Sequence, residues 1–245
     1  MARRLRLTIA YDGARYVGWQ RQNNGPSVQA AIEDTLFAMT QEKRPLRGAS
    51  RTDAGVHAIG QVAHIDTDKA ISTNGFFRGL NSMLPDDIRI LSVREVDGSF
   101  DARLSNLGKL YRYSLHRGRV ALPDQTRRAW LIYQPLQLEA MRRGAQAFVG
   151  LHDFAAFRAA DCERLTTTRR VHRVDVVGHG EQVLIDVEGE GFLKNMVRIM
   201  VGSLVDLGLG RRPPEHIAAL LISRNREEAG QTAPAHGLTL VKVIY

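Results

Sequence analysis

The sequence predicts an α+β protein composed of two mixed α/β domains. Segments that alternate apolar and polar residues, as strands with one buried face do, occur in both halves of the chain. Segments with the apolar spacing of helices lie between them in both halves. The 245 residues suffice for one large or two modest domains. We therefore expect an N-terminal domain over residues 1–105 and a C-terminal domain over residues 106–245.

The first half begins with a predicted strand over residues 4–11, in which Leu5, Leu7 and Ile9 fall on one face. Ser27 then has the side chain of an N-cap, and apolar residues follow it at helical spacing. The remaining predicted elements of this half are a loop over residues 48–60, a strand over 61–67, a helix over 74–84 that ends before Pro85, and a strand over 88–96.

The second half repeats this mixture. Its predicted elements are a strand around residues 111–115, a helix over 136–148, a hairpin of strands 171–177 and 183–188, a helix over 192–207, a short helix after Pro214, and a closing strand over 238–244. The helix over 192–207 has the strongest pattern, and Gly208 and Gly210 end it. Lys194 and Arg198 would stand at positions i and i+4 of this helix and share one face.

The charge of the chain indicates a nucleic-acid partner. The formal net charge is +8 and the sequence pI is about 10.0, although a basic enzyme with another substrate is the competing interpretation. The single cysteine, Cys162, allows no internal disulfide and fits the reducing cytoplasm. The basic N-terminus is followed by no apolar signal segment, and no run approaches the roughly 18 apolar residues that span a bilayer, so we expect no membrane association.

The densest polar segment, residues 50–58, contains a candidate nucleophile. Asp53 lies two positions after Arg51, and a nearby guanidinium favours the ionised form of a carboxylate. An ionised aspartate can act as a nucleophile at neutral pH. Local physics alone equally allows an Asx turn with a surface charge pair.

The segment Arg51-Thr52-Asp53-Ala54-Gly55-Val56-His57-Ala58 resembles the catalytic loop of the tRNA pseudouridine synthases of the TruA type. Other stretches resemble that family in the same order: Tyr11-Asp12-Gly13, Gly18-Trp19-Gln20-Arg21-Gln22, Ser27-Val28-Gln29, Leu84-Pro85-Asp86-Asp87-Ile88, Phe100-Asp101-Ala102-Arg103, Lys109-Leu110-Tyr111-Arg112-Tyr113, Gly150-Leu151-His152-Asp153-Phe154, Met196-Val197-Arg198 and Thr232-Ala233-Pro234-Ala235. The resemblance extends from about residue 7 to the C-terminus. Four positions depart from the family pattern: Ser50 replaces a usual Gly, Ala30 a common Gly, Asp101 a frequent His and Thr239 a frequent aromatic residue.

The resemblance implies the pseudouridine synthase fold, with a largely antiparallel sheet in each domain, helices on one face, and an active-site cleft between the domains. It implies that uridines at positions 38, 39 and 40 of the tRNA anticodon stem-loop are isomerised to pseudouridine. The isomerisation conserves all atoms, so no cofactor is expected. The implied partners are tRNA and a second copy of the chain.

The same resemblance assigns catalytic roles. Asp53 would be the nucleophile, and Arg51 would enter the space left by the flipped nucleotide. Tyr111 would pack on the flipped base and is a candidate to help remove the proton at carbon 5. Arg198 would pair with Asp53 across the cleft.

Substrate binding is expected from further side chains. Leu238 would pack against the base, beside Tyr111 and Arg51. The candidate phosphate contacts around the cleft are Arg3, Arg4, Arg6, Arg15, Arg21, Arg78, Lys109 and Arg112.

Two other functions are compatible with some of these features. A non-catalytic tRNA-binding or chaperone protein would keep the fold, but such copies usually lose the nucleophile first. A metal-dependent nuclease would need a carboxylate cluster, which the sequence does not offer. His57, His64 and His152 have no standard metal-ligand spacing, so no metal is expected and His57 is interpreted as a hydrogen-bonding residue that orders the loop.

Overall fold

The computed structural model describes residues 2–120, 122–162 and 164–245, which form two compact units. The first unit comprises Met1–Leu107 and Leu240–Tyr245, and the second comprises Gly108–Thr239. The sequence analysis assigned all residues after 105 to the second domain, whereas the last residues of the chain belong to the first unit. Within the described ranges, no helix is both long and apolar enough to cross a bilayer.

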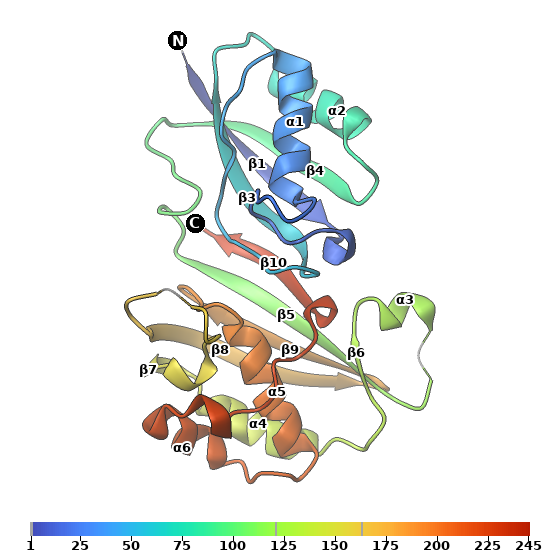
Figure 1. The fold of residues 1–245 in the computed structure, drawn as a ribbon, viewed down its shortest axis with the longest axis vertical. Helices are drawn as coiled ribbons and strands as arrows, with labels where there is room; N and C mark the ends of the chain where they lie inside the picture. Colours follow the sequence, from blue (N-terminus) through green and yellow to red (C-terminus); the bar gives the residue numbers. More distant parts are fainter. Residues whose placement is uncertain (1, 121, 163) are drawn as a thin grey trace. The chain divides into compact units, whose positions relative to one another are not determined.

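The first unit contains a sheet with the strand order β4-β1-β3-β10 (Figure 1). These strands are β4 (Ile88–Val96), β1 (Arg3–Tyr11), β3 (His57–Thr67) and β10 (Leu238–Ile244), whose first two residues belong to the second unit; β2 (Arg47–Gly48) also pairs with β3. β1 is antiparallel to both β3 and β4. Its buried residues Leu5, Leu7 and Ile9 alternate with partly exposed ones, which confirms the predicted first strand.

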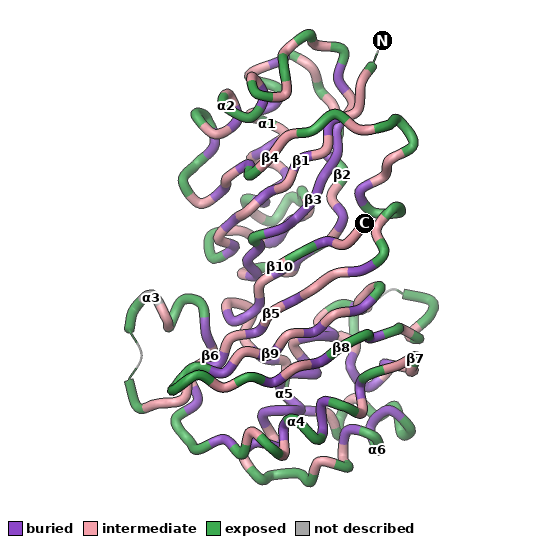
Figure 2. The backbone as a smooth tube through the Cα atoms, turned by 180° about the vertical axis from the view of Figure 1, so that it is seen from behind, coloured by how far each residue is buried: buried purple, intermediate pink, exposed green. Residues whose placement is uncertain are grey.

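Two helices, α1 (Val28–Thr40) and α2 (Thr73–Met83), lie on one face of this sheet, and the view from behind shows strands without helices over them (Figures 1 and 2). Ser27 caps α1 as predicted, because its side chain accepts a hydrogen bond from the Ala30 N–H. Ser72 caps α2 in the same way through the Gly75 N–H. A short 3-10 helix, η1 (Gly13–Arg15), follows β1.

The second unit contains a sheet with the strand order β5-β9-β8-β7, and these strands are antiparallel to one another. Its elements are β5 (Gly108–Arg117), α3 (Pro123–Thr126), β6 (Trp130–Ile132), α4 (Leu138–Gln146), β7 (Gly150–Asp153), η2 (Ala155–Phe157), β8 (Thr168–His179), β9 (Gln182–Gly189), α5 (Met196–Gly208), α6 (His216–Ser223), η3 (Arg226–Glu228) and η4 (Ala235–Gly237). β6 pairs with β5 in the parallel direction. The predicted α+β class with largely antiparallel sheets is confirmed.

Two predicted boundaries were wrong. The segment 48–60 is not a loop throughout, because β3 begins at His57 and continues to Thr67. The helix predicted from residue 192 begins only at Met196, because Asn195 adopts a left-handed backbone conformation with φ 61° and ψ 4°. Lys194 therefore lies before α5 and shares no helical face with Arg198; its ammonium group instead pairs with Asp161 at 2.6 Å.

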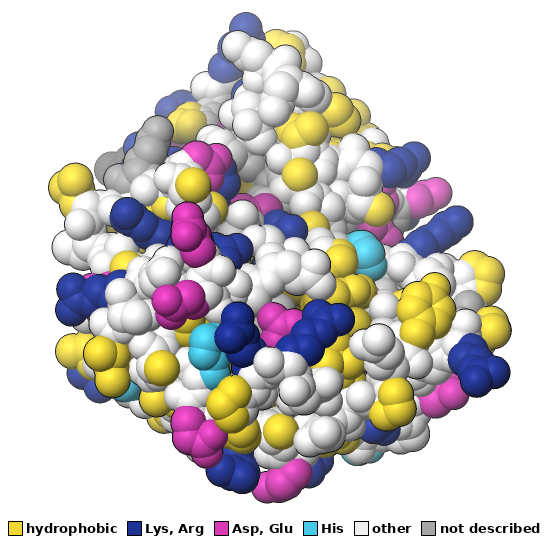
Figure 3. Space-filling view, turned by 60° about the horizontal axis from the view of Figure 1, so that its bottom comes forward, with side chains coloured by type: hydrophobic (Ala, Val, Ile, Leu, Met, Phe, Trp, Pro, Cys, Tyr) yellow, Lys and Arg dark blue, Asp and Glu magenta, His cyan; other side chains and the backbone are white. Residues whose placement is uncertain are grey.

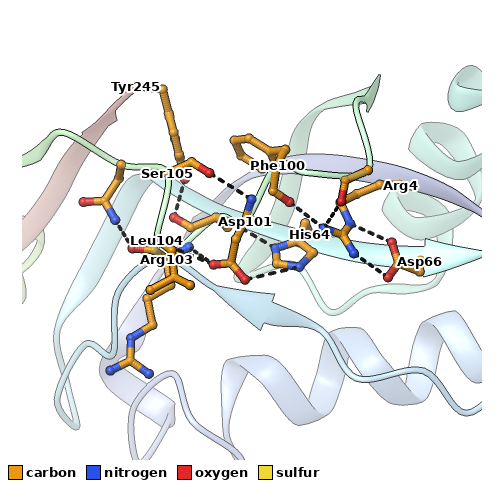
Figure 4. A network of polar contacts seen from close by, with 12 residues as sticks. Arg4, His64, Asp66, Phe100, Asp101, Arg103, Leu104, Ser105 and Tyr245 are labelled. Atoms are coloured by element: carbon orange, nitrogen blue, oxygen red, sulfur yellow. Dashed lines mark hydrogen bonds and ion pairs between the residues drawn. The ribbon is translucent and has the colours of Figure 1, made fainter.

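A network of polar contacts around Asp101 lies beside β1 and β3 in the first unit (Figure 4). Asp101 accepts hydrogen bonds from the backbone N–H groups of Arg103 and Leu104, and its Oδ2 lies 3.9 Å from His64 Nε2. His64 Nδ1 accepts a hydrogen bond from the Ala102 N–H. Burial opposes ionisation of Asp101, but the N–H groups of Leu104 and Arg103 outweigh it and lower the carboxyl pKa. Asp101, which replaces the frequent His of the family pattern, therefore supplies a carboxylate that accepts hydrogen bonds within a turn.

Candidate active site

The loop that carries Asp53 is fixed by the segment that follows β1. The Tyr11 hydroxyl lies 2.7 Å from Thr52 Oγ1. The Trp19 N–H donates to the Thr52 carbonyl at 3.1 Å, and the Gly55 N–H donates to the Tyr16 carbonyl at 3.3 Å. The backbone on both sides of Asp53 is therefore tied to residues 11–19.

Two glycines allow this segment to approach the loop so closely. A Cβ at Gly13 would lie 2.0 Å from the Val56 carbonyl oxygen, and a Cβ at Gly18 would lie 2.6 Å from the Thr52 carbonyl oxygen. Gly18 also has φ +114°, a conformation that side chains rarely adopt. The loop thus needs glycine at both positions.

His57 and Gln61, both fully buried, hold the two ends of the loop. The Gly13 N–H donates to His57 Nδ1 at 3.1 Å, as expected for a histidine that orders the loop. Gln61 accepts from the Ser50 N–H at 3.2 Å and donates to the Ser50 carbonyl at 2.7 Å. Both contacts use backbone atoms of Ser50, which a glycine at that position would also supply.

Asp53 and Arg51 project from this fixed backbone. Asp53 is half-buried and Arg51 is exposed, whereas Thr52 between them is buried. The Val56 N–H donates to the Asp53 carbonyl at 3.1 Å and closes a turn. The arrangement presents a carboxylate and a guanidinium on either side of a buried anchor residue.

In the second unit, Tyr111 lies on β5 opposite Val187 of β9. Its ring meets the ring of Phe192 edge to face, with centroids 5.3 Å apart and planes at 90°. Phe192 was expected to begin the helix over 192–207 and was given no role in the site. Lys109 precedes Tyr111 on the same strand and faces Gly189. Leu238 is buried where β10 begins.

Arg198 lies in the first turn of α5, a helix whose described residues are otherwise almost all buried. Its Nε donates to the Ala233 carbonyl at 2.7 Å, and the Ala233 N–H donates to the Arg198 carbonyl at 3.1 Å. Its Nη1 donates to Asn195 Oδ1 at 2.9 Å. These contacts fix the plane of the guanidinium through two of its five N–H donors.

Close packing against α5 places Ala233 at this position. A Cβ at Gly202 would lie 1.8 Å from the Gln231 carbonyl oxygen, and a Cβ at Gly230 would lie 2.4 Å from the Ser203 nitrogen. The Gly230 N–H donates to Ser203 Oγ at 2.9 Å. The segment 230–233 therefore runs directly along the helix and ends at Arg198.

Asn195 departs from two local preferences at the start of α5. An asparagine at an N-cap usually accepts a hydrogen bond from the first helical turn, a contact that contributes about 1 kcal/mol. Among the described residues, no side chain makes that contact at α5. The left-handed conformation costs a non-glycine residue about 1 kcal/mol more. Asn195 thus makes no capping hydrogen bond to α5 and adopts an unfavourable backbone conformation. Its side chain instead accepts a hydrogen bond from Arg198.

Most of the predicted phosphate contacts form ion pairs within the chain. The pairs are Arg3 with Glu95, Arg4 with Asp66, Arg15 with Asp87, Arg21 with Glu33 and Asp34, and Arg112 with Asp186. Arg6 instead lies over the Tyr245 ring, 4.5 Å from its centroid. Figure 3 shows the same mixture on one face, where Lys and Arg side chains alternate with Asp and Glu. The net charge of +8 already counts these acidic partners, so the paired arginines add little positive field of their own.

Comparison with known proteins identifies the family. The sequence model described as tRNA pseudouridine synthase matches residues 7–103 and 145–245. The chain belongs to the tRNA pseudouridine synthase family. Members of this family are isomerases that convert uridine in tRNA to pseudouridine.

Several tRNA pseudouridine synthases A are similar over nearly their whole length. The protein from Syntrophotalea carbinolica is 48% identical over 98% of this chain and 96% of its own. That from Pelobacter propionicus is 46% identical over 99% and 100%, and that from Myxococcus xanthus is 44% identical over 99% and 92%. A solved structure titled as a Cbf5-Nop10-Gar1 complex aligns with a TM-score of 0.37 at 14% identity, over 96% of this chain and 48% of the other.

The predicted site residues of this family member are divided between the units. Asp53 and Arg51 lie in the first, and Tyr111 and Arg198 lie in the second with Lys109 and Leu238. Within the described part of the chain, no three His, Cys, Asp or Glu side chains form a group suited to a metal ion. The supporting residues that the sequence did not reveal are Tyr11, Phe192, Asn195 and Ala233, all identified by their contacts.

Proposed function

We propose that this protein isomerises uridines at positions 38, 39 and 40 of the tRNA anticodon stem-loop, in the cytoplasm, with Asp53 as the nucleophile. The reaction breaks the bond between the uracil nitrogen and the ribose and forms a bond from carbon 5 to the same ribose carbon. The base loses the proton at carbon 5 and gains one at the released nitrogen, so atoms and electrons balance without a co-reactant.

The observation that carries this proposal is the way the first unit holds Asp53. A half-buried carboxylate stands on a turn whose backbone is tied to residues 11–19, to His57 and to Gln61. Such a fixed backbone is what nucleophilic catalysis requires, because the attacking atom must be held in place before the substrate arrives. Ordinary surface carboxylates need no support of this kind.

The other residues complete the proposed roles. Arg51, exposed beside Asp53, would fill the space left by the flipped nucleotide. Tyr111, steadied by the Phe192 ring, would stack on the flipped base. The positively charged Arg198 would pair with the nucleophile, Asp53. Leu238 would pack against the base, and Lys109 would contact the RNA backbone.

Tritium release tests the proposal. The substrate is an anticodon-arm transcript with uridine labelled at carbon 5 and placed singly at position 38, 39 or 40, with EDTA present. We expect release by the wild type and none by Asp53→Ala or Asp53→Asn, with tRNA binding by both variants nearly unchanged. Tight binding without release by the wild type would instead support a non-catalytic tRNA-binding protein. Activity that EDTA abolishes would support a metal-dependent enzyme.

We also propose that the active form is a homodimer in which each tRNA touches both copies. Sedimentation equilibrium of the protein alone and with tRNA tests this part. Twice the mass of one chain, 27.3 kDa, is expected for the free protein. A monomer that retains full activity would refute it.

A further inference from the structure

We infer that Asn195 is a positioning residue for catalysis, which sets the orientation of the Arg198 guanidinium through a side-chain hydrogen bond. The inference rests on the proposed function, because it assumes that Arg198 acts in the reaction. It adds a residue that contacts neither the nucleophile nor the base in the proposed roles.

Two hydrogen bonds hold the Arg198 guanidinium. Asn195 Oδ1 accepts from Arg198 Nη1 at 2.9 Å, while Arg198 Nε donates to the Ala233 carbonyl at 2.7 Å. Two acceptors on different edges of one planar group define both the position and the plane of that group. A guanidinium donates along fixed directions, so its plane determines where its other N–H groups point.

The backbone of Asn195 suits this contact. Asn195 has φ 61° and ψ 4°, and α5 begins directly after it. The left-handed residue completes the turn at residues 194–195 before the helix, and its side chain contacts Arg198, three residues later. Asparagine tolerates this conformation better than most residues other than glycine, and glycine would offer no side-chain acceptor. The structure therefore combines the residue type that fits the conformation with the acceptor that Arg198 contacts.

Among the described residues, two other non-glycine residues share this left-handed conformation. Gln41 and Arg224 have φ 58° each, and both stand at helix C-caps, where a left-handed residue is usual. Asn195 alone among the three precedes a helix and forms its side-chain contact with a residue assigned to the site. A left-handed non-glycine residue at a helix start, where it makes no side-chain cap, points to a functional constraint.

The test uses Asn195→Gly with Gln41→Gly as the matched control. Both replacements relieve a left-handed backbone, but only the first removes the acceptor of Arg198. For Asn195→Gly we expect kcat to fall by about 10- to 100-fold, the loss that misplaced catalytic groups cause, with KM within about twofold and an unchanged melting temperature. For Gln41→Gly we expect wild-type kcat and KM. Wild-type kcat in Asn195→Gly, or equal losses in both variants, would overturn the inference.

Asn195→Asp provides the conservative variant, since it keeps both the acceptor and the tolerance of the left-handed conformation. We expect it to retain most of the kcat that Asn195→Gly loses, and a variant as impaired as Asn195→Gly would count against the inference. A crystal structure of Asn195→Gly gives a readout besides activity. The Arg198 guanidinium should leave its wild-type plane, and an unchanged plane would overturn the inference. Absence of tritium release by the wild type would refute the proposed function, while the crystallographic comparison still tests the coupling of the two residues.

Discussion

The hydroxyl oxygens of Tyr11 and Thr52 lie 2.7 Å apart, and both side chains are buried. Tyr11 is the last residue of β1, and Thr52 directly precedes the proposed nucleophile Asp53. The contact therefore joins the end of β1 to the loop that carries Asp53. A phenylalanine at position 11 could not form this contact, because it has no hydroxyl group.

Removing this contact should lower stability and activity together. We expect Tyr11→Phe and Thr52→Val each to reduce the free energy of unfolding by about 1–2 kcal/mol. Each replacement removes one hydroxyl of the pair, so the other buried hydroxyl loses this partner. The double variant should lose less than the sum of the two, since the first replacement already removes the shared contact. Urea denaturation of the four proteins measures this, and strictly additive losses would show that the two hydroxyls do not interact.

Replacement of Gly13 should disturb the loop through its backbone. A Cβ at Gly13 would lie 2.0 Å from the Val56 carbonyl oxygen, which cannot move without shifting the loop. We expect Gly13→Ala to lower the free energy of unfolding by about 1–3 kcal/mol and to reduce tritium release. Gly98→Ala is the control, because no described atom lies within 4 Å of the added Cβ. It should leave stability unchanged or raise it by up to about 1 kcal/mol.

His64 should make stability depend on pH. Burial lowers the pKa of His64 below the ordinary value of 6.5. The negative charges of Asp101 and Asp66 oppose this lowering, and the positive charges of Arg4 and Arg47 add to it. Above pH 6.5 His64 is neutral in both the folded and the unfolded chain. As the pH falls below 6.5 the unfolded chain binds the proton more readily, so the free energy of unfolding decreases.

Urea denaturation at pH 7.5 and pH 5.5 measures this effect. His64→Asn retains an acceptor for the Ala102 N–H but has no group that titrates in this range. We expect its stability to change less between the two pH values than that of the wild type. An equal decrease in both proteins would assign the effect to other groups.

Arg51 should matter most when the target nucleotide is hard to extrude. The guanidinium is exposed beside Asp53 and is proposed to occupy the space that the flipped nucleotide leaves. We expect Arg51→Ala to reduce kcat/KM strongly for a target in a stable stem and much less for the same target opposite a mismatch. Equal losses on both substrates would indicate a general phosphate contact, and full activity on both would exclude any role.

Much of the fold could be predicted because local signals and tertiary structure agree. The alternation from Leu5 to Tyr11 and the cap at Ser27 report packing and hydrogen bonds that involve only neighbours along the chain. The helix start at Met196 was missed because apolar spacing continues through Phe192 and Leu193. At that point the Met196 N–H donates to the Leu193 carbonyl at 3.1 Å and the Asn195 side chain accepts from Arg198, two contacts that apolar spacing does not indicate.

The supports of the site could not be predicted for a related reason. Tyr11 and Thr52 are 41 positions apart in sequence, and Arg198 and Ala233 are 35 apart. No periodic pattern connects residues at such separations. The resemblance to a family proposed roles for Asp53, Tyr111 and Arg198, but it did not indicate which neighbours orient them.

The C-terminus has a consequence for biosynthesis. The residues Leu240–Tyr245 belong to the first unit, where the Leu107 N–H donates to the Ile244 carbonyl and the Tyr245 hydroxyl donates to the Ala102 carbonyl. A nascent chain emerges from the ribosome N-terminus first, and domains generally fold in that order. The unit that leaves the ribosome first therefore lacks one of its strands until residues 240–245 have emerged. We expect this unit to complete its sheet last, although its first residue is made first.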